Sequence, residues 1–232
     1  MRFRIADLQV ELSCHTDTLA VAEPYATEAQ GAADMVITPA EYDTLPIQPP
    51  AGADPATADY VSSGAVFGRK LIPHGGLVLH ACAVVHKERA YLFAAPSGTG
   101  KSTHVGLWCQ QFPDCYVLND DKPAIRVTAD GIYAYGTPWA GKQRQNRNAK
   151  VPLGGICFLQ RGETDRICRV DAAEALVALY AQTAHMALTQ TEMDALLTTI
   201  EKLLRMVPAY RLQCTPTPHA AEVAYRGMVE EG

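Results

Sequence analysis

The sequence predicts an α/β protein with a mixed, hairpin-rich sheet and a helical C-terminal part. Apolar, strand-like segments dominate between residues 77 and 170, and several are joined by short polar turns. From residue 171 onward, apolar residues recur every three to four positions, which is typical of amphipathic helices. Of the 232 residues, 48% are hydrophobic and 19% charged, so the chain can bury a sizeable core.

The first 60 residues are expected to form an appendage of unknown role to a main domain at residues 61–232. Residues 2–12 alternate apolar and polar side chains and predict one strand. Residues 16–34, rich in Ala and Thr, fit no single element. Residues 46–59 contain four prolines and predict a loop, which marks the boundary between the two parts.

The main domain is expected to begin with strands and end with helices. The predicted strands are residues 77–86, 89–94, 115–119, 124–127, 132–135, 153–159, 166–170 and 210–214. Asp130-Gly131 predicts a hairpin turn, and residues 161–165 predict a second hairpin between their flanking strands. The predicted helices are 102–111, 171–183, 191–206 and 219–229, with Asp171 and Thr191 as N-caps.

Charge and cysteine content exclude several classes of protein. Twenty Lys and Arg against 25 Asp and Glu give a net charge of −5, so no global positive field attracts nucleic acid. No apolar run reaches the ~18 residues that span a bilayer, and the N-terminus lacks a signal-peptide hydrophobic block. Seven widely spaced cysteines predict neither a disulfide framework nor a zinc site. We therefore expect a soluble cytoplasmic protein without a membrane partner.

Residues 95–103, Ala-Pro-Ser-Gly-Thr-Gly-Lys-Ser-Thr, match the phosphate-loop pattern G-x-x-x-x-G-K-[ST] except that Ala95 replaces the first glycine. The glycines allow backbone N–H groups to turn inward around an anion, and the start of the following helix adds its positive end. Lys101 supplies a full charge to the β- and γ-phosphates, and the Ser102 hydroxyl suits Mg²⁺. The predicted nucleotide contacts are Ser97, Gly98, Thr99, Gly100, Lys101, Ser102 and Thr103. The alternative is a glycine-rich turn that binds no nucleotide.

Two adjacent carboxylates, Asp120 and Asp121, follow a predicted strand nineteen residues after Lys101. One helix, one turn and one strand fit this interval, so the pair is expected beside the loop. Successive side chains at a strand end point in different directions. One carboxylate can therefore bind Mg²⁺ while the other faces an incoming nucleophile. The alternative is a solvated acidic turn, because Asp is also a turn former.

These residues resemble the HPr kinase/phosphorylase family and its shorter HPr-kinase-like relatives, which share the phosphoenolpyruvate carboxykinase-like variant of the phosphate-loop fold. The resemblance runs from about residue 75 to 159, then more loosely to the end. It is specific in Leu79-His80-Ala81, Ser97-Gly98-Thr99-Gly100-Lys101-Ser102 and Asp120-Asp121. It implies that Asp120 is the general base, that His80 supports Asp120, and that Asp121 binds Mg²⁺, although the two carboxylate roles are interchangeable at this stage. Taken alone, His80 also fits a hydrogen-bonded core residue.

Residues 136–142, Gly-Thr-Pro-Trp-Ala-Gly-Lys, are similar to the Pro-[aromatic]-x-Gly-Lys element of the shorter relatives, and cations follow at positions 144, 147 and 150. Lys142 and Arg144 are the candidates for neutralising charge on the transferred phosphoryl group. The alternative for this segment is a mobile basic loop. Trp139 is expected either to face adenine or substrate, or to be a buried anchor.

The leading functional hypothesis is an ATP- and Mg²⁺-dependent transfer of the γ-phosphate to a Ser or Thr hydroxyl of a peptide or protein. The family's second signature, which carries phosphorylase activity, is not recognisable here, so a peptide substrate is weighted above HPr itself. Two alternatives share the same residues: a kinase of a small hydroxylated metabolite, and a nucleotide-binding regulatory protein without turnover. The sequence leaves the oligomeric state open, a homo-oligomer included.

Overall fold

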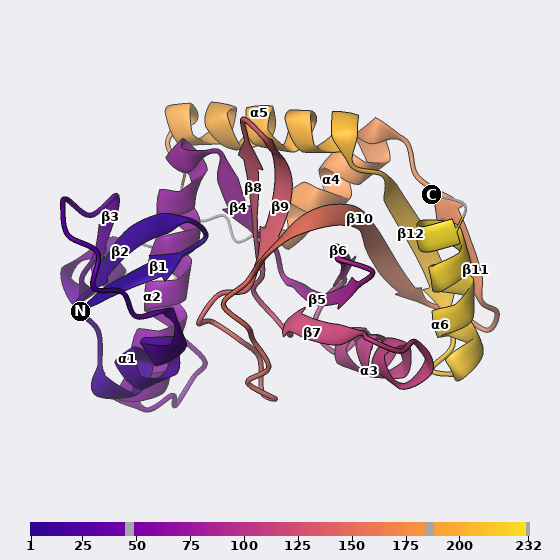
Figure 1. Cartoon of the computed structure of the whole chain (residues 1–232), viewed down its shortest axis with the longest axis horizontal. Coiled ribbons are helices and arrows are strands. Elements are labelled where there is room, and N and C mark those ends of the chain that lie inside the picture. The colour runs from indigo at the N-terminus through magenta and orange to yellow at the C-terminus, as the bar shows by residue number, and fades with distance from the viewer. Residues whose placement is uncertain (45–48, 184–187, 231–232) are drawn as a thin grey trace.

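A curled, mixed sheet of nine strands forms the centre of the molecule (Figure 1). The computed structural model describes residues 1–44, 49–183 and 188–230, and the following elements lie within them. The strands are β1 Arg2–Ile5, β2 Leu8–Leu12, β3 Met35–Ile37, β4 Gly76–Val78, β5 Ala81–His86, β6 Arg89–Ala94, β7 Tyr116–Asn119, β8 Ala124–Thr128, β9 Gly131–Tyr135, β10 Lys150–Arg161, β11 Arg166–Arg169 and β12 Ala209–Cys214. The helices are α1 Thr16–Ala22, α2 Pro55–Leu71, α3 Lys101–Gln111, α4 Ala172–Gln182, α5 Gln190–Met206 and α6 Pro218–Tyr225. The predicted mixed α/β class is thereby confirmed.

The long strand β10 joins the two halves of the sheet. Its first residues pair antiparallel with β9, and its later residues pair in parallel with β6 on one side and β12 on the other. The sheet order is β4-β8-β9-β10-β6-β5-β7, with β12 and then β11 added beside the far end of β10. Where the partners change, a Cβ on Gly154 would lie 2.9 Å from Cε1 of Tyr91. Glycine there lets β10 bend closely over β6, which curls the sheet.

Helices cover both faces of this sheet and bury two separate apolar clusters. On one face α4 and α5 pack on the strands through residues that include Leu179, Ile200 and Leu203. On the other face α3 and α6 pack around Trp108, Phe93 and Tyr91. In the described part of the chain, no helix is both long enough and apolar enough to cross a bilayer.

The N-terminal residues form a three-stranded sheet, β1-β2-β3, that packs on α2 (Figure 1). Helix α2 begins at Pro55, capped by Asp54, inside the segment expected to be a loop. The boundary expected at residue 60 therefore falls within α2, and residues 46–48 of the predicted loop lie outside the described residues. Trp139 stacks on Phe67 of α2 with ring centroids 4.7 Å apart, so this residue is a buried anchor between the two sheets.

Several predicted elements differ in the structure. Residues 2–12 form a hairpin and not one strand, because Ala6 and Asp7 both take positive φ values and reverse the chain. The predicted strand 77–86 is divided at residues 79–80 into β4 and β5, which pair with different strands. The predicted hairpin of residues 153–170 is wrong, since β12 lies between β10 and β11. Helix α5 is capped by Thr189 through a capping box with Glu192, and Thr191 lies inside the helix.

The other predicted elements are confirmed to within a few residues. They include β6, β7, β12, α3, the β8–β9 hairpin around Asp130-Gly131, and helix α4 with its cap Asp171. The predicted final helix corresponds to α6 followed by a wider helical turn at Arg226–Glu230.

Candidate functional site

The loop of residues 95–100, called the glycine loop below, connects β6 to α3 as the sequence predicts. Gly98 and Gly100 have φ values of 79° and 118°, in the region that favours glycine. A Cβ on either residue would meet nothing within 4 Å, so the need for glycine here is conformational and not steric. Ala95 has no positive φ, so its side chain is tolerated where the phosphate-loop pattern has glycine.

Lys101, the first residue of α3, points back under the glycine loop. Its Nζ donates to Ala95 O at 2.7 Å and lies 3.2 Å from Nε2 of His80. The residue is only 8% exposed, and this burial lowers the pKa of its ammonium group. The charge of Lys101 is therefore held at a fixed position between the glycine loop and His80.

Asn119, the last residue of β7, shapes the chain that carries the two carboxylates. Its buried side-chain Oδ1 accepts hydrogen bonds from the backbone N–H of Asp121 at 2.9 Å and of Lys122 at 2.7 Å. Its Nδ2 donates to Thr137 O at 3.1 Å. Sequence reasoning missed Asn119, although an Asn directly before two Asp at a strand end is a signal for an Asx turn.

His80 lies beside Asp121 and Lys101, whereas the family resemblance implied support of Asp120. His80 Nε2 is 3.2 Å from Asp121 Oδ1. His80 takes this position because it lies between β4 and β5 and belongs to neither strand. Its backbone N–H donates to Gln182 O at 2.8 Å. Burial alone would raise the pKa of Asp121, but the hydrogen bond from His80 and the charge of Lys122 at 2.8 Å outweigh it and hold this pKa at about 2.

Asp120 lies on the opposite side of the turn and is held by the backbone. Its Oδ1 accepts from the N–H of Gly141 at 2.6 Å, and the residue is 7% exposed. The Cys82 thiol donates to Asp120 O at 2.9 Å and lies 3.7 Å from the Ser102 hydroxyl. Cys82 thus connects the carboxylate turn to the start of α3. Burial raises the pKa of this thiol to about 11, so it stays protonated.

The cations of residues 142–150 do not gather at one place. Lys142 and Arg144 are exposed. The backbone N–H of Arg144 donates to the carbonyl of Gly141, the residue whose own N–H binds Asp120. Arg147 instead lies over the Tyr116 ring at 4.2 Å, and Lys150 pairs with Asp7 at 3.0 Å. The expected cationic cluster is therefore wrong for positions 147 and 150, and only Lys142 and Arg144 stay at the margin of the carboxylates.

A cavity of about 380 Å³ lies between α1, the start of α2 and the loop that contains Gly141, whose N–H binds Asp120. Tyr60 lines it, and its hydroxyl accepts from Ala140 N at 2.5 Å and lies 3.1 Å from Pro138 O. Burial raises the pKa of Tyr60 to about 12, so this hydroxyl remains neutral. The N-terminal 60 residues thus supply one wall of a cavity beside Gly141, a role that the sequence did not reveal.

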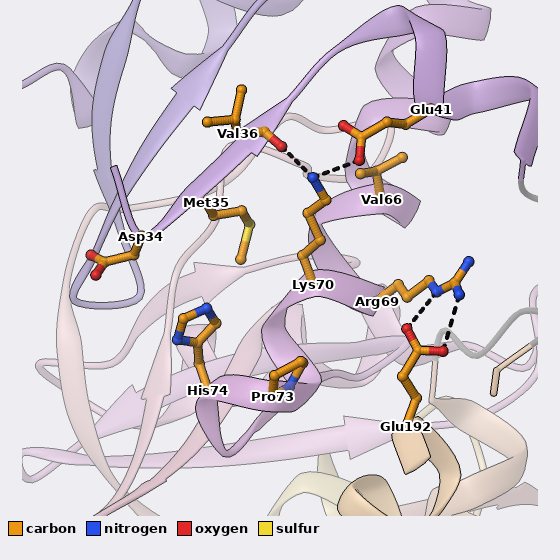
Figure 2. Close-up of a pocket in the computed structure, with 10 residues that line it drawn as sticks. All are labelled: Asp34, Met35, Val36, Glu41, Val66, Arg69, Lys70, Pro73, His74 and Glu192. Atoms are coloured by element: carbon orange, nitrogen blue, oxygen red, sulfur yellow. Dashed lines mark hydrogen bonds and ion pairs between the residues drawn. The ribbon is translucent and has the colours of Figure 1, made fainter. Parts of the chain in front are cut away.

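A larger cavity of about 530 Å³ lies far from the glycine loop, between β3, α2 and α5 (Figure 2). Its acidic groups all accept hydrogen bonds from within the protein. Glu192 binds Arg69 through two hydrogen bonds of 2.7 and 3.0 Å, Glu41 binds Lys70 at 2.5 Å, and Asp34 accepts from Gln9 N at 2.8 Å. These contacts join the N-terminal sheet to α2 and α2 to α5, so we assign this cavity a structural role.

The Arg69–Glu192 pair predicts an acid-dependent stability. The hydrogen bond from Arg69, opposed by burial, lowers the pKa of Glu192 from 4.5 to about 2 in the folded protein. Because the folded pKa lies below the unfolded one, the pair stabilises the protein fully above pH 4.5 and loses this effect as the pH falls toward 2. We expect Glu192→Gln to lower the melting temperature at pH 7, and this difference from wild type to shrink by more than half at pH 3.

Glu201→Gln is the matched control, because Glu201 pairs with Arg205 on the exposed side of the same helix and is expected to contribute little. A Glu192→Gln difference that stays constant between pH 7 and pH 3 would contradict the prediction.

The residues expected to hold Mg²⁺ are oxygen donors on adjoining segments. Ser102 is the second residue of α3, and its hydroxyl lies 3.7 Å from the Cys82 thiol. The same thiol donates to the backbone carbonyl of Asp120, the residue before Asp121. Within residues 1–44, 49–183 and 188–230, no three His, Cys, Asp or Glu side chains come together as a metal cluster. A hydroxyl and one carboxylate nevertheless suit Mg²⁺, which usually keeps several waters and binds through one or two protein ligands plus substrate phosphates.

A comparison with models of protein families gives a match. The chain is similar to the family described as SynChlorMet cassette protein ScmC over residues 62–223. No curated protein matches the sequence. The matched region begins in α2 and ends in α6, so it includes the nine-stranded sheet, the glycine loop and both carboxylates. Since it covers more than half of the sequence, the chain belongs to the ScmC family of SynChlorMet cassette proteins.

Proposed function

We propose that this protein is an ATP-dependent kinase, related to the HPr-kinase-like serine kinases with a phosphoenolpyruvate carboxykinase-like phosphate loop. It transfers the γ-phosphate to a Ser or Thr hydroxyl of a peptide or protein. The observation that carries the proposal is that His80 Nε2 lies 3.2 Å from both the Lys101 ammonium group and the Asp121 carboxylate. These residues are 20 or more positions apart in sequence, yet they meet beside a loop of the phosphate-binding pattern.

The glycine loop is the proposed phosphate site. Its positive φ values at Gly98 and Gly100 favour inward N–H groups, and the first turn of α3 adds the positive end of its dipole. In the structure, Lys101 donates to the carbonyl of Ala95 at 2.7 Å. On binding, its ammonium group exchanges this carbonyl for β- and γ-phosphate oxygens, which are stronger acceptors because they are charged.

The two carboxylates differ in ways that favour separate roles. Asp121 has a pKa of about 2 and stays ionised, which suits a Mg²⁺ ligand together with Ser102. The bound Mg²⁺ would supply charge neutralisation on the phosphates. Asp120 uses Oδ1 to accept from Gly141, while its Oδ2 has no hydrogen-bond donor among the described contacts. Asp120 is therefore the proposed general base, and His80 is a positioning residue for Asp121 and Lys101.

The proposed reaction conserves atoms and charge in one displacement. The acceptor O–H gives its proton to the Asp120 carboxylate as the oxygen attacks the γ-phosphorus. The bond from that phosphorus to the oxygen bridging it to the β-phosphate breaks on the opposite side, and ADP leaves. Lys101 stabilises the negative charge at the transferred group, with Lys142 and Arg144 at the acceptor side.

A second candidate, a kinase of a small hydroxylated metabolite, is favoured by one observation. The cavity beside Gly141, whose N–H binds the proposed base Asp120, has a volume of about 380 Å³, within the range of sites that enclose small molecules. A peptide acceptor would use the same place with the rest of its chain outside. Both candidates therefore share the catalytic residues and differ only in the acceptor.

The test is label transfer from γ-labelled ATP in the presence of Mg²⁺. The acceptors are a library of Ser- and Thr-containing peptides and, separately, a panel of free hydroxy amino acids and sugars. Label on the peptides supports the leading candidate, and label only on small molecules supports the second. ATP binding without any labelled product overturns both and leaves a nucleotide-binding regulatory protein.

A further inference from the structure

An apolar groove lies between α4 and α5, the two helices that cover one face of the sheet. It has a volume of about 660 Å³, and Leu176 of α4 and Leu197 and Leu204 of α5 line it. In Figure 1, α5 runs along one edge of the molecule with α4 next to it. None of the described residues that line the groove belongs to the glycine loop or to the carboxylate turn. The groove is therefore separate from the proposed catalytic site.

Helix α4 has few charges for a helix at the surface. Its eleven residues, Ala-Ala-Glu-Ala-Leu-Val-Ala-Leu-Tyr-Ala-Gln, include one charged side chain, that of Glu174. Ala175 and Leu179 are buried against the sheet, while Val177, on the opposite side of the helix, is 69% exposed. Val177 lies one turn after Ala173, which lines the groove. A helix that is apolar on all sides is normally buried, which indicates that another molecule covers the exposed side of α4.

The charges of α5 indicate what that molecule is. The residues of α5 that line the groove are spaced by three and four positions and form one face of the helix: Asp194, Leu197, Thr198, Glu201, Leu204 and Arg205. Asp194 lies toward the start of α5 and Arg205 toward its end, so the outermost charges of this face have opposite signs. Packing two copies of α5 antiparallel places Asp194 of each copy opposite Arg205 of the other, whereas parallel packing places like charges together.

Both charges are accessible to a second copy. The side chain of Arg205 is 75% exposed although it binds Glu201 one turn earlier, and Asp194 is exposed where it accepts from Gln190 Nε2 at 2.8 Å. Exposed pairs within one helix contribute little to stability, so these side chains can form contacts across an interface at small cost. The face is thus self-complementary, as a two-fold dimer requires.

We propose that two copies of this chain form a symmetric dimer through the α4–α5 groove. The two α5 helices pack antiparallel across the two-fold axis, and ion pairs between Asp194 and Arg205 of opposite copies flank an apolar centre that contains Leu197. The α4 helices lie at the sides, where the other copy covers Val177. Because none of these residues takes part in the proposed phosphoryl transfer, this inference is independent of the proposed function.

Sedimentation velocity of the full chain, at concentrations from about 1 μM to about 100 μM, tests the dimer directly. We expect wild type to reach twice the mass of a single chain, which is 25.1 kDa. Val177→Glu places a carboxylate from each copy in the apolar interface and is expected to raise the dissociation constant at least about a hundredfold. Val177 is largely exposed in one copy, so the variant is expected to fold, which circular dichroism verifies.

Met206→Glu is the matched control for this substitution. Met206 is 66% exposed on α5, and it does not line the groove. We expect this variant to keep the mass and the dissociation constant of wild type.

Charge reversal tests the antiparallel arrangement. Asp194→Arg and Arg205→Asp each bring like charges together across the interface, and each is expected to weaken the dimer about fivefold. The double variant restores opposite charges and is expected to recover the affinity of wild type. Within one copy the two residues are about 16 Å apart along the helix, so the recovery can only arise between copies.

Three results would contradict the proposal. A wild-type protein that stays monomeric at the highest concentration would overturn it and leave the groove to a different protein. A dimer that Val177→Glu does not weaken would place the interface elsewhere on the molecule. A double variant that binds no more tightly than the single variants would exclude the antiparallel pairing of Asp194 with Arg205.

Discussion

Lys101→Met is expected to reduce phosphoryl transfer by about 10²–10³-fold and to weaken ATP binding as well. The methionine keeps the length of the side chain and removes the charge. Lys101 donates to Ala95 O beneath the glycine loop, so its ammonium group is already positioned before any nucleotide binds. Little reorganisation is needed when phosphate oxygens replace this carbonyl, and the whole charge acts on the transferred group. Label transfer and calorimetry measure the two effects.

The matched control for this prediction is Lys87→Met. Lys87 lies in the turn between β5 and β6, at the end of β6 away from the glycine loop, and donates to the Tyr225 hydroxyl. We expect its substitution to leave transfer unchanged. Normal transfer and ATP affinity in Lys101→Met would mean that this lysine is a structural residue of the loop and that phosphates bind elsewhere.

Asp120→Asn is expected to lower transfer by about 10²–10⁴-fold with ATP affinity preserved. The amide keeps the shape of the side chain, and its oxygen still accepts from the N–H of Gly141 as the carboxylate does at 2.6 Å. The amide cannot take up the proton of the acceptor hydroxyl, so the rate of the chemical step falls. Single-turnover label transfer at saturating ATP isolates that step from binding.

Asp114→Asn provides the control, since Asp114 precedes β7 at the end opposite Asp120 and Asn tolerates its positive φ of 63° equally well. Two results would count against the assigned role. Full transfer in Asp120→Asn would exclude this residue as the base, and lost ATP binding would make it part of the nucleotide site.

The same two measurements on Asp121→Asn test the proposed Mg²⁺ ligand. We expect this variant to bind MgATP more weakly than wild type.

The local part of the candidate site was predictable from the sequence. The strand, glycine loop and helix around Lys101 are contiguous, so residue type and spacing were sufficient to place them. The turn after β7 was predictable for the same reason, and so was the hairpin at Asp130-Gly131. In these segments the conformation of each residue depends on its neighbours in the chain and on its own backbone preferences.

The partners of these residues were not predictable in the same way. His80 contacts Asp121 and not Asp120 because the chain leaves the sheet between β4 and β5, which a continuous apolar run does not reveal. Lys150 pairs with Asp7 of the N-terminal hairpin, 143 positions earlier, so counting cations in a loop overestimated the charge near the carboxylates. The contacts of Cys82 to Asp120 O and Ser102 likewise depend on strand pairing.

The sequence by itself determined the class of fold, the glycine loop between a strand and a helix, and the pair of carboxylates at a strand end. Only the tertiary structure decided that β12 separates β10 from β11, that the N-terminal residues line the cavity beside Gly141, and that His80 lies beside Asp121. The physical reason is that local conformation depends on each residue and its neighbours. Contacts between distant segments depend instead on how whole apolar faces pack, and many pairings of strands bury similar faces.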